Sequence, residues 1–408
     1  MAVGPDMPAE LATPRGVRLG VTAAGIRKPD RNDLVLMELA PGSRTAAVFT
    51  RNGLRAAPVL VAQEHLAAAS PLLLVINTGS ANAATGNAGL ETARAVCAAA
   101  AELAGRDTAE VLPFSTGVIG EPLALGPFEA GLPACHEDLK GDAEDWWQAA
   151  DAIRTTDTRP KVASRTLTLD GETVTVTGFA KGSGMIQPNM ATMLAFVATD
   201  AAVAEEPLQA VLAAATEASF NRISVDGDTS TNDALTLSAT GAAGMAPMES
   251  ATDPRLPALR EAVTAVCRDL ALAIVRDGEG ATRLLTVRAT GAADASEAAR
   301  VVEAIARSPL VKTAAFAGDP NWGRILAAAG SALGGDVDWS GVDLYLGDVR
   351  AVRGGVMDPT YTEAAGAAAM APDEVTVTLN LGRGEAADWM WTCDLSYEYV
   401  TINAEYRS

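Results

Sequence analysis

The chain has 408 residues, a formal net charge of −20 at pH 7, and 49% hydrophobic but only 4% aromatic residues. Its length suggests two lobes or one large unit, with enough apolar sequence for a sizeable core. The negative charge, with no cluster of basic residues, argues against a nucleic-acid-binding protein, because phosphate groups are bound by clustered Lys and Arg.

Several other classes of protein are also disfavoured. No stretch reaches the run of about 18 apolar residues that a membrane helix requires, and residues 1–16 lack the regions of a signal peptide. The four cysteines match no zinc spacing, and the two histidines do not lie near a Ser or Thr in a glycine-rich turn. We therefore expect a cytoplasmic protein that binds no membrane, nucleic acid or metal and holds no cofactor.

Apolar patterns alternate along the first half of the chain. They predict helices at 57–69, 87–105 and 143–154 and buried strands at 72–77 and 110–115. Two alternating segments, 161–170 and 172–181, meet at Asp170-Gly171, a dipeptide typical of a β-hairpin turn.

The same alternation continues through the second half. An apolar, strand-like run begins at Met190; further strands are predicted at 234–241, 284–291 and 375–382, with helices at 207–219, 255–277 and 295–308. Strands that alternate with helices, together with a hairpin, indicate an α/β (mixed α+β) fold in which mixed β-sheets are sandwiched by helices.

Two segments fall short of ligand-binding motifs. Gly20 and Gly25 have the spacing of P-loop glycines, but Ile26 stands where the lysine is required. VDGDTSTND (225–233) begins like a calcium loop, but Leu237 occupies the position of the bidentate Glu. Neither segment therefore predicts a phosphate or calcium site.

The segment KGSGMIQPNMATMLAF (181–196) places Thr192 at the start of an apolar run, after Lys181, two glycines and a proline turn. A threonine in such a run is ordinarily a β-branched strand residue. It can instead be a nucleophile whose base is its own α-amine, with an unperturbed pKa of about 7.7–8.0, if the bond before it is cut. The Thr192 hydroxyl would attack the Ala191 carbonyl, and water would hydrolyse the resulting ester.

Acyl chemistry also requires hydrogen-bond donors for a developing oxyanion. FSTGVIG (114–120) follows a predicted strand and offers the Thr116 hydroxyl and the Gly117 backbone N–H. The alternative for this segment is a plain turn between a strand and a helix.

These segments, with others in the same order, resemble the blocks of one enzyme family. KGSGMIQPNMATML is similar to the self-cleavage segment of the ornithine acetyltransferase (glutamate N-acetyltransferase, ArgJ) family. The resemblance begins near residue 16 and includes NTGSANAATG (77–86), STGVIG (115–120), AIRTTDTRPK (152–161), SFNRISVDGDTSTND (219–233), DGEGATR (277–283), AGDPNWGRIL (317–326) and TINAEYRS (401–408). Ser80 and Ala84 depart from the family's usual Asn and Cys, and we expect neither change to abolish catalysis.

The resemblance implies a fold reminiscent of N-terminal-nucleophile hydrolases and a precursor that cuts itself between Ala191 and Thr192. The α chain 1–191 and the β chain 192–408 would stay intertwined as one catalytic unit and assemble as a heterotetramer of two α and two β chains. The implied reaction is ping-pong: Thr192 takes acetyl from N2-acetylornithine and passes it to glutamate, in arginine biosynthesis.

The resemblance also implies roles for single residues. Thr116 and Gly117 match the family's oxyanion pair. The positions that match its substrate contacts are Thr155, Lys181, Thr192, Glu279, Asn403 and Ser408; Thr155 is preferred to Thr156. A cation such as Lys181 suits the α-carboxylate that ornithine and glutamate share, and Glu279 suits the side-chain ammonium of ornithine.

Other functions remain open from the sequence. An N-terminal-nucleophile amidohydrolase or aminopeptidase would use the same Thr192 but give the acyl group to water. A relative in specialised metabolism would keep the chemistry, and a non-catalytic amino-acid-binding protein would not need Thr192, Thr116 and Glu279. The sequence does not decide whether acetyl-CoA is a second acetyl donor.

Overall fold

The computed structural model describes residues 2–5, 10–187, 193–335 and 337–405. The chain forms two compact units. The larger unit comprises residues 6–221 and 228–274, and the smaller unit comprises residues 1–5, 222–227 and 275–408. No helix in the described ranges is long and apolar enough to cross a membrane.

The larger unit holds two β-sheets. The four-stranded sheet has the order β1-β2-β4-β5, formed by Val17–Thr22, Leu34–Leu39, Leu73–Asn77 and Val111–Ser115. The five-stranded sheet has the order β3-β10-β8-β7-β6, formed by Arg44–Phe49, Ala234–Ala239, Leu194–Thr199, Glu172–Lys181 and Lys161–Leu169. Both sheets are mixed, because β4 pairs β5 and β8 pairs β10 in parallel while the other neighbours are antiparallel.

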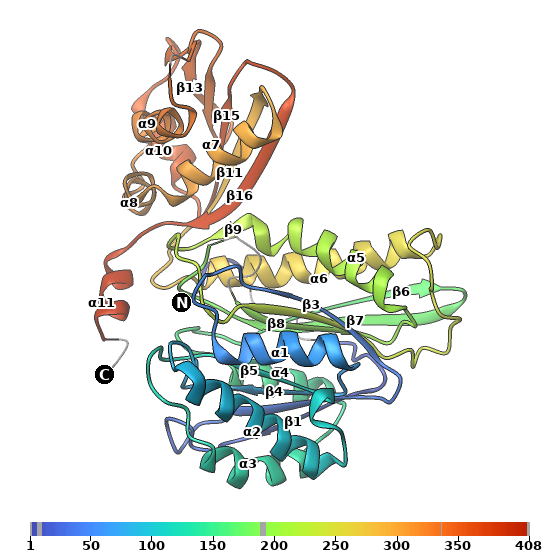
Figure 1. Ribbon diagram of the computed structural model, residues 1–408. Coiled ribbons are helices and arrows are strands. Elements are labelled where there is room, and N and C mark those ends of the chain that lie inside the picture. The colour runs from blue at the N-terminus through green and yellow to red at the C-terminus, as the bar shows by residue number, and fades with distance from the viewer. Residues whose placement is uncertain (1, 6–9, 188–192, 336, 406–408) are drawn as a thin grey trace. The chain divides into compact units, whose positions relative to one another are not determined.

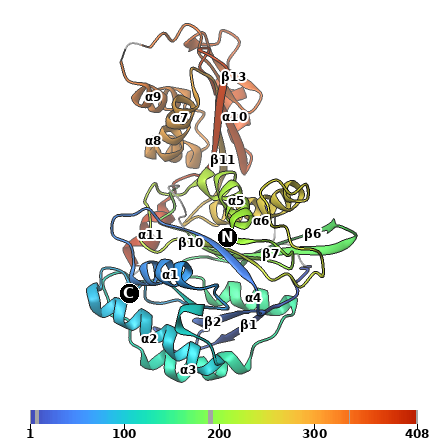
Figure 2. The ribbon, with the colours of Figure 1, turned by 45° about the vertical axis from the view of Figure 1, so that its right-hand side comes forward.

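The helices are α1 (Ala57–Ala68), α2 (Gly86–Ala104), α3 (Gly126–Glu137), α4 (Ala143–Ala152), α5 (Glu205–Glu217) and α6 (Leu256–Arg276), with short 3-10 turns at Thr108–Glu110 and Phe220–Arg222. Helix α4 packs between the two sheets, against β1 and β2 of one and β6 and β7 of the other, and α1 packs against β5. Figures 1 and 2 both show α2 and α3 beyond the four-stranded sheet and α5 and α6 beyond the five-stranded sheet.

Four aromatic side chains pack against one another in the core between the two sheets. Phe114 on β5 and Phe196 on β8 meet edge to face with ring centroids 5.0 Å apart. Phe179 on β7 contacts Phe196 at 5.2 Å and Trp146 on α4 at 5.8 Å. Edge-to-face aromatic pairs pack favourably beyond their buried area, so these four rings fix β5 against β7 and β8. This packing brings the end of β5 close to the end of β7 and the start of β8.

The predicted hairpin turn is confirmed. Leu169 pairs with Glu172, and the two intervening residues, Asp170 and Gly171, have φ values of 53° and 85°. Two consecutive positive φ values define the turn that matches strand twist, which is why the Asp-Gly dipeptide signals it.

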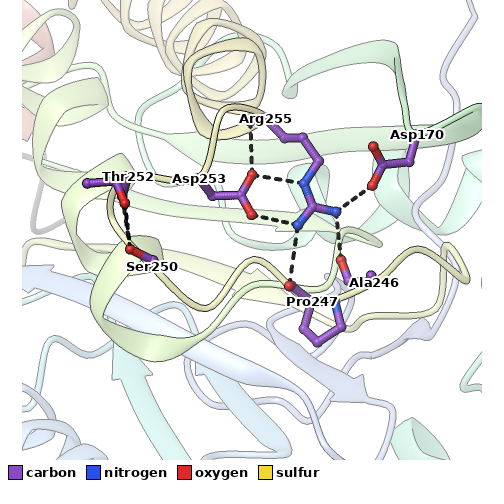
Figure 3. A network of polar contacts seen from close by, with 7 residues as sticks. All are labelled: Asp170, Ala246, Pro247, Ser250, Thr252, Asp253 and Arg255. Carbon is purple, nitrogen blue, oxygen red and sulfur yellow. Dashed lines mark hydrogen bonds and ion pairs between the residues drawn. The ribbon is translucent and has the colours of Figure 1, made fainter.

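Arg255, immediately before α6, joins this turn to the loop that follows β10 (Figure 3). Its guanidinium donates to Asp170 at 2.5 Å, to both oxygens of Asp253 at 2.8 and 2.6 Å, and to the carbonyls of Ala246 and Pro247 at 3.0 and 3.3 Å. The hydrogen bonds from Arg255 lower the pKa of Asp253 to about 2. One planar side chain with five donors thus connects two loops.

The smaller unit is built on one seven-stranded sheet. Its order is β14-β13-β12-β15-β11-β16-β9, formed by Val356–Met357, Val349–Arg353, Asp343–Leu346, Glu374–Asn380, Leu284–Ala292, Ala386–Cys393 and Ile223–Ser224. The helices are α7 (Ala295–Arg307), α8 (Pro309–Ala317), α9 (Trp322–Leu333), α10 (Glu363–Met370) and α11 (Tyr397–Glu405). The buried face of α7 packs on β11 and β16 in a core of small aliphatic side chains.

The predicted mixed α/β architecture is confirmed, and every predicted helix is found within two residues of its expected ends. The predicted run from Met190 is found as β8, which begins at Leu194; its first residues lie outside the described ranges. The sequence patterns predicted neither the helices α3 and α8 to α11 nor the strands β1 to β3, β9, β12 to β14 and β16. Among these, α3 contains Pro133 and the strands β12 to β14 are short. Proline inside a helix and strands of two to five residues leave no readable periodicity.

Candidate active site

The first part of the candidate site is the turn that follows β5. The Thr116 N–H donates to Asn77 O at 3.0 Å, and the Val118 N–H donates to Gly79 O at 3.3 Å, so this turn lies against the turn after β4. Gly117 has a φ of 134°, and a Cβ at this position would lie 2.4 Å from the Gly79 carbonyl carbon. Only glycine permits this approach of the two backbones.

Buried polar side chains from the end of β4 and from the segment before β10 hydrogen-bond to the turn after β5. The Ser115 hydroxyl donates to Asn77 Oδ1 at 2.6 Å. Asn232 Nδ2 donates to Ser115 O at 2.9 Å and to Ala81 O at 2.6 Å, and Thr231 Oγ1 donates to Asn232 Oδ1 at 2.7 Å. The residues just before β10 therefore fix both turns at once. Such satisfied networks pre-organise backbone groups.

Lys181 meets this turn from the neighbouring sheet. It is the last residue of β7 and pairs with Leu194, the first residue of β8. Its Nζ donates to Thr116 Oγ1 at 3.4 Å, and both side chains are buried. Because Lys181 occupies an oxygen lone pair of Thr116, the hydroxyl proton of Thr116 is left to donate to another acceptor. The structure thus brings together two residues for which the sequence predicts different roles.

Asp157 connects the end of β7 to the loop that carries Thr155. Its Oδ1 accepts from Lys161 Nζ at 2.6 Å and from the Gly182 N–H at 2.7 Å, and its Oδ2 accepts from the Thr155 N–H at 3.0 Å. Burial alone would raise the pKa of Asp157, but the charges of Lys161 and Lys181 outweigh that effect. With the hydrogen bonds, they hold the pKa well below its usual range, so this buried carboxyl is ionised.

Asp233 immediately precedes β10. Its backbone carbonyl accepts from the Thr50 N–H at 2.9 Å, and the next N–H, of Ala234, donates to Met193 O at 2.9 Å. Ala234 is paired with Leu194 on β8. Leu194 therefore lies in register between Lys181 on one side and Ala234 on the other. Burial raises the pKa of the Asp233 carboxyl well above its usual range.

The other predicted substrate contacts lie in the smaller unit. Glu279 is a buried residue in the turn after α6, and it accepts a hydrogen bond from Asn403 Nδ2 on α11 at 2.7 Å. Gly280 has a φ of 70°, and a Cβ there would lie 2.6 Å from Ser396 Oγ and 2.7 Å from Tyr399 N. This glycine allows the turn to contact the start of α11, so Glu279 and Asn403 come together.

Three predicted residues, Ala191, Thr192 and Ser408, lie outside the described residues. No sequence pattern distinguished Asp157, Asn232 and Asp233, although all three stand in the segments AIRTTDTRPK and SFNRISVDGDTSTND that carry the resemblance. Only their burial and their contacts distinguish them from the other polar residues of those segments.

Comparison with known families gives one match that spans almost the whole chain. The model described as the ArgJ family matches residues 18–408. A protein of Psychrobacter arcticus named "Arginine biosynthesis bifunctional protein ArgJ" is 52% identical over 409 residues, covering 100% of both chains. A protein of Pseudomonas syringae pv. tomato with the same name is 51% identical over 409 residues, again covering 100% of both.

Two solved structures are also similar. The ArgJ protein of Bacillus halodurans is 40% identical, with a TM-score of 0.48, covering 51% of this chain and 97% of that chain. The ornithine acetyltransferase of Mycobacterium tuberculosis, complexed with ornithine, is 34% identical, with a TM-score of 0.39, covering 44% of this chain and 94% of that chain.

Proposed function

This chain belongs to the ArgJ family of arginine-biosynthesis acetyltransferases, and we propose that it transfers acetyl from N2-acetylornithine to glutamate through an acetyl ester on Thr192. The observation that carries the mechanism is the contact between Lys181 and Thr116 at the glycine turn. It joins a cation for the substrate's carboxylate to a hydroxyl donor for the oxyanion.

The enzyme first cuts itself. The Thr192 hydroxyl attacks the Ala191 carbonyl, the peptide C–N bond breaks, and an ester forms while the nitrogen gains a proton. Water then hydrolyses the ester and leaves Thr192 with a free α-amine. The flanking strands support a stable two-chain product: β7 ends at Lys181, β8 begins at Leu194, and the two pair along six positions of one sheet. Chains 1–191 and 192–408 would stay associated through this sheet.

Acetyl transfer follows in two halves. The α-amine accepts the Thr192 hydroxyl proton as the oxygen attacks the acetyl carbonyl, and it returns the proton to the amine of ornithine as the amide bond breaks. The amine of glutamate then attacks the acetyl ester and restores free Thr192. Thr116 Oγ1–H and the Gly117 N–H stabilise the negative oxygen of each tetrahedral intermediate. The fixed turn supports this role, because donors that are already in place need no reorganisation.

The charges of the substrates indicate which residues bind them. Lys181 pairs with the α-carboxylate common to both substrates, and Glu279 pairs with the side-chain ammonium of ornithine. Asn403, which hydrogen-bonds to Glu279, keeps that carboxylate oriented. Thr155 and Ser408 are the remaining proposed substrate contacts, because they match substrate-contact positions of the family. The two-chain products assemble as a heterotetramer of two α and two β chains.

The test is incubation of the purified protein with N2-acetylornithine and glutamate, with mass-spectrometric detection of ornithine and N-acetylglutamate. Both products are expected, and Thr192→Ala should form neither. Without glutamate, an acetyl group should accumulate on the chain that begins at Thr192. Ornithine release at equal rates with and without glutamate would instead indicate an amidohydrolase. A parallel incubation with acetyl-CoA and glutamate shows whether the enzyme uses a second donor.

A further inference from the structure

The two substrates of the proposed reaction carry opposite charges at the ends of their side chains. Ornithine ends in an ammonium group and glutamate in a carboxylate, while both share the α-carboxylate assigned to Lys181. Glu279, the proposed partner of the ammonium, is buried and would repel a carboxylate placed beside it, because like charges are unfavourable in a buried site. Glutamate therefore needs a separate cation for its side-chain carboxylate.

The loop of residues 23–33, between β1 and β2, is held in place by Asp33. This side chain is buried, and its two oxygens accept hydrogen bonds from the N–H groups of Ala24 at 2.7 Å and Ile26 at 2.6 Å. The Asp33 carbonyl accepts from the Thr78 N–H at 2.9 Å. These contacts fix the loop beside the turn after β4.

The same loop lies directly against the glycine turns of the candidate site. A Cβ at Gly79 would lie 2.8 Å from Arg27 Cβ, so Arg27 covers Gly79. Gly79 in turn packs against Gly117, where a Cβ would lie 2.4 Å from the Gly79 carbonyl carbon. A single turn of backbone therefore separates the loop from the proposed oxyanion donor.

Arg31, on this loop, reaches the segment that carries Thr155. Its Nη2 donates to the carbonyl of Arg154, and its guanidinium is partly buried there. The next residue along the chain is Thr155, whose N–H donates to Asp157 Oδ2 at 3.0 Å. This contact places a cation beside a residue that matches a substrate-contact position of the family.

Arg31 differs from the nearby arginines in its partners. Arg27 is ion-paired with Glu121 at 2.8 Å, and Arg154 with Asp151 at 2.5 Å. Arg31 contacts no carboxylate in the described part of the chain, and the Arg154 carbonyl occupies only one of its N–H donors. A guanidinium is a planar fork of five donors that matches a carboxylate, and partial burial makes a charge without a counter-ion unfavourable. Arg31 is therefore suited to an anionic ligand.

We propose that Arg31 binds the side-chain carboxylate of glutamate and so makes glutamate the preferred acetyl acceptor. The inference rests on the proposed function, because it concerns the second half of that reaction. Arg31 donates charge-assisted hydrogen bonds to the side-chain carboxylate while Lys181 holds the α-carboxylate. The side chain of N2-acetylornithine has no carboxylate for Arg31, so the first half of the reaction does not depend on this residue.

The two halves of a ping-pong reaction can be measured separately in the self-cleaved enzyme. In Arg31→Gln, kcat/KM for glutamate should fall by about 10- to 100-fold, the usual effect of losing a hydrogen bond to a charged group. The burst of ornithine released from N2-acetylornithine without glutamate should keep its wild-type rate and amplitude. If Arg31 only fastened the loop to Arg154, both halves would slow.

Glutamine, which has the shape of glutamate without the charge, serves as a second acceptor. The wild type should prefer glutamate, and Arg31→Gln should lose that preference because kcat/KM for glutamine stays nearly unchanged. Arg27→Gln is the matched control, since it is the same substitution on the same loop but removes an exposed ion pair that contributes little. This control should keep the wild-type preference.

A wild-type preference in Arg31→Gln, or an equal loss in both halves of the reaction, would overturn the inference. Should Arg31→Gln fail to fold, Arg31→Lys keeps a donor for the Arg154 carbonyl but lacks the planar fork. It should lose part of the preference for glutamate, and an unchanged preference would again overturn the inference. The proposed function fails differently, because a wild type that releases no ornithine from N2-acetylornithine would contradict acetyl transfer to any acceptor.

Discussion

At the scale of single residues, Thr116 and Lys181 show how a site can be divided between two sheets. Thr116 follows β5 of the four-stranded sheet and Lys181 ends β7 of the five-stranded sheet, yet their side chains are hydrogen-bonded at 3.4 Å. The lysine occupies the hydroxyl oxygen and directs the proton away from itself. This arrangement gives the two residues distinct kinetic signatures.

Thr116→Val keeps the shape of the side chain and removes the donor. If Thr116 stabilises the oxyanion, kcat should fall by about 10²–10³, which is the usual cost of losing one such donor. The rate must be divided by the fraction of enzyme that has cut itself, because the same donor would serve self-cleavage. Normal cutting together with the wild-type kcat would show that the segment is only a turn.

Glu279→Gln removes a charge while it keeps the size and an oxygen that can accept from Asn403. If Glu279 pairs with the substrate ammonium, that interaction exists before and during acyl transfer, so its loss should raise KM for N2-acetylornithine and change kcat little. Steady-state kinetics with both substrates measure the effects on KM and on kcat separately. The KM for glutamate, which lacks that ammonium, is the internal control, and an equal rise in both KM values would contradict the assignment.

At the scale of elements, the site depends on turns that hold strand ends together. Gly117→Ala should displace the turn after β5, because a Cβ would lie 2.4 Å from the Gly79 backbone at a φ of 134°. We expect a lower melting temperature and a loss of kcat. Gly120→Ala is the matched control: its φ is 87°, but a Cβ there meets nothing within 4 Å. The control carries the backbone strain without the clash and should keep most of its activity.

Asp157 joins the loop at Thr155 to the end of β7, so Asp157→Asn should destabilise the fold. It leaves the buried Lys161 without its ionised partner, a change that typically costs about 3–5 kcal/mol. Because the folded-state pKa of Asp157 is lowered, its stabilisation is present above the ordinary Asp pKa of about 3.9 and is lost as pH falls below it. Chemical denaturation of the wild type and of Asp157→Asn between pH 7 and pH 3 should show that their difference in free energy of unfolding shrinks as the pH falls. A constant difference would contradict the ion pair between Asp157 and Lys161.

At the scale of the whole molecule, self-cleavage should leave two chains. Intact-mass analysis of the purified protein should show chains 1–191 and 192–408, and Thr192→Ala should give one chain of 408 residues. The two chains should co-purify under native conditions, because β7 and β8 pair within one sheet. Uncut wild-type protein that still transfers acetyl would rule out the α-amine as base, since that amine would not exist.

Much of the molecule follows from its sequence alone. Long periodic helices such as 87–105 and 255–277, the Asp170-Gly171 hairpin and the mixed α/β class are local patterns, and the structure confirms them. The family also follows, because its blocks are short strings that keep their order along the chain, and the family comparison confirms it. The residue roles that the family implies remain predictions for the experiments above.

Tertiary structure alone decided which polar residues share a site. Asp157, Asn232 and Asp233 stand among many similar side chains, and each became distinctive only through burial and partners. Parallel pairing of β8 with β10 and antiparallel pairing of β8 with β7 bring residues near 181, 194 and 234 into register. Sequence does not reveal such pairings, because strands far apart in the chain are matched by packing against a common core. The pKa of a buried carboxyl depends on the same contacts, which is why the pKa of Asp157 is held below its ordinary value by neighbouring lysines while burial raises that of Asp233.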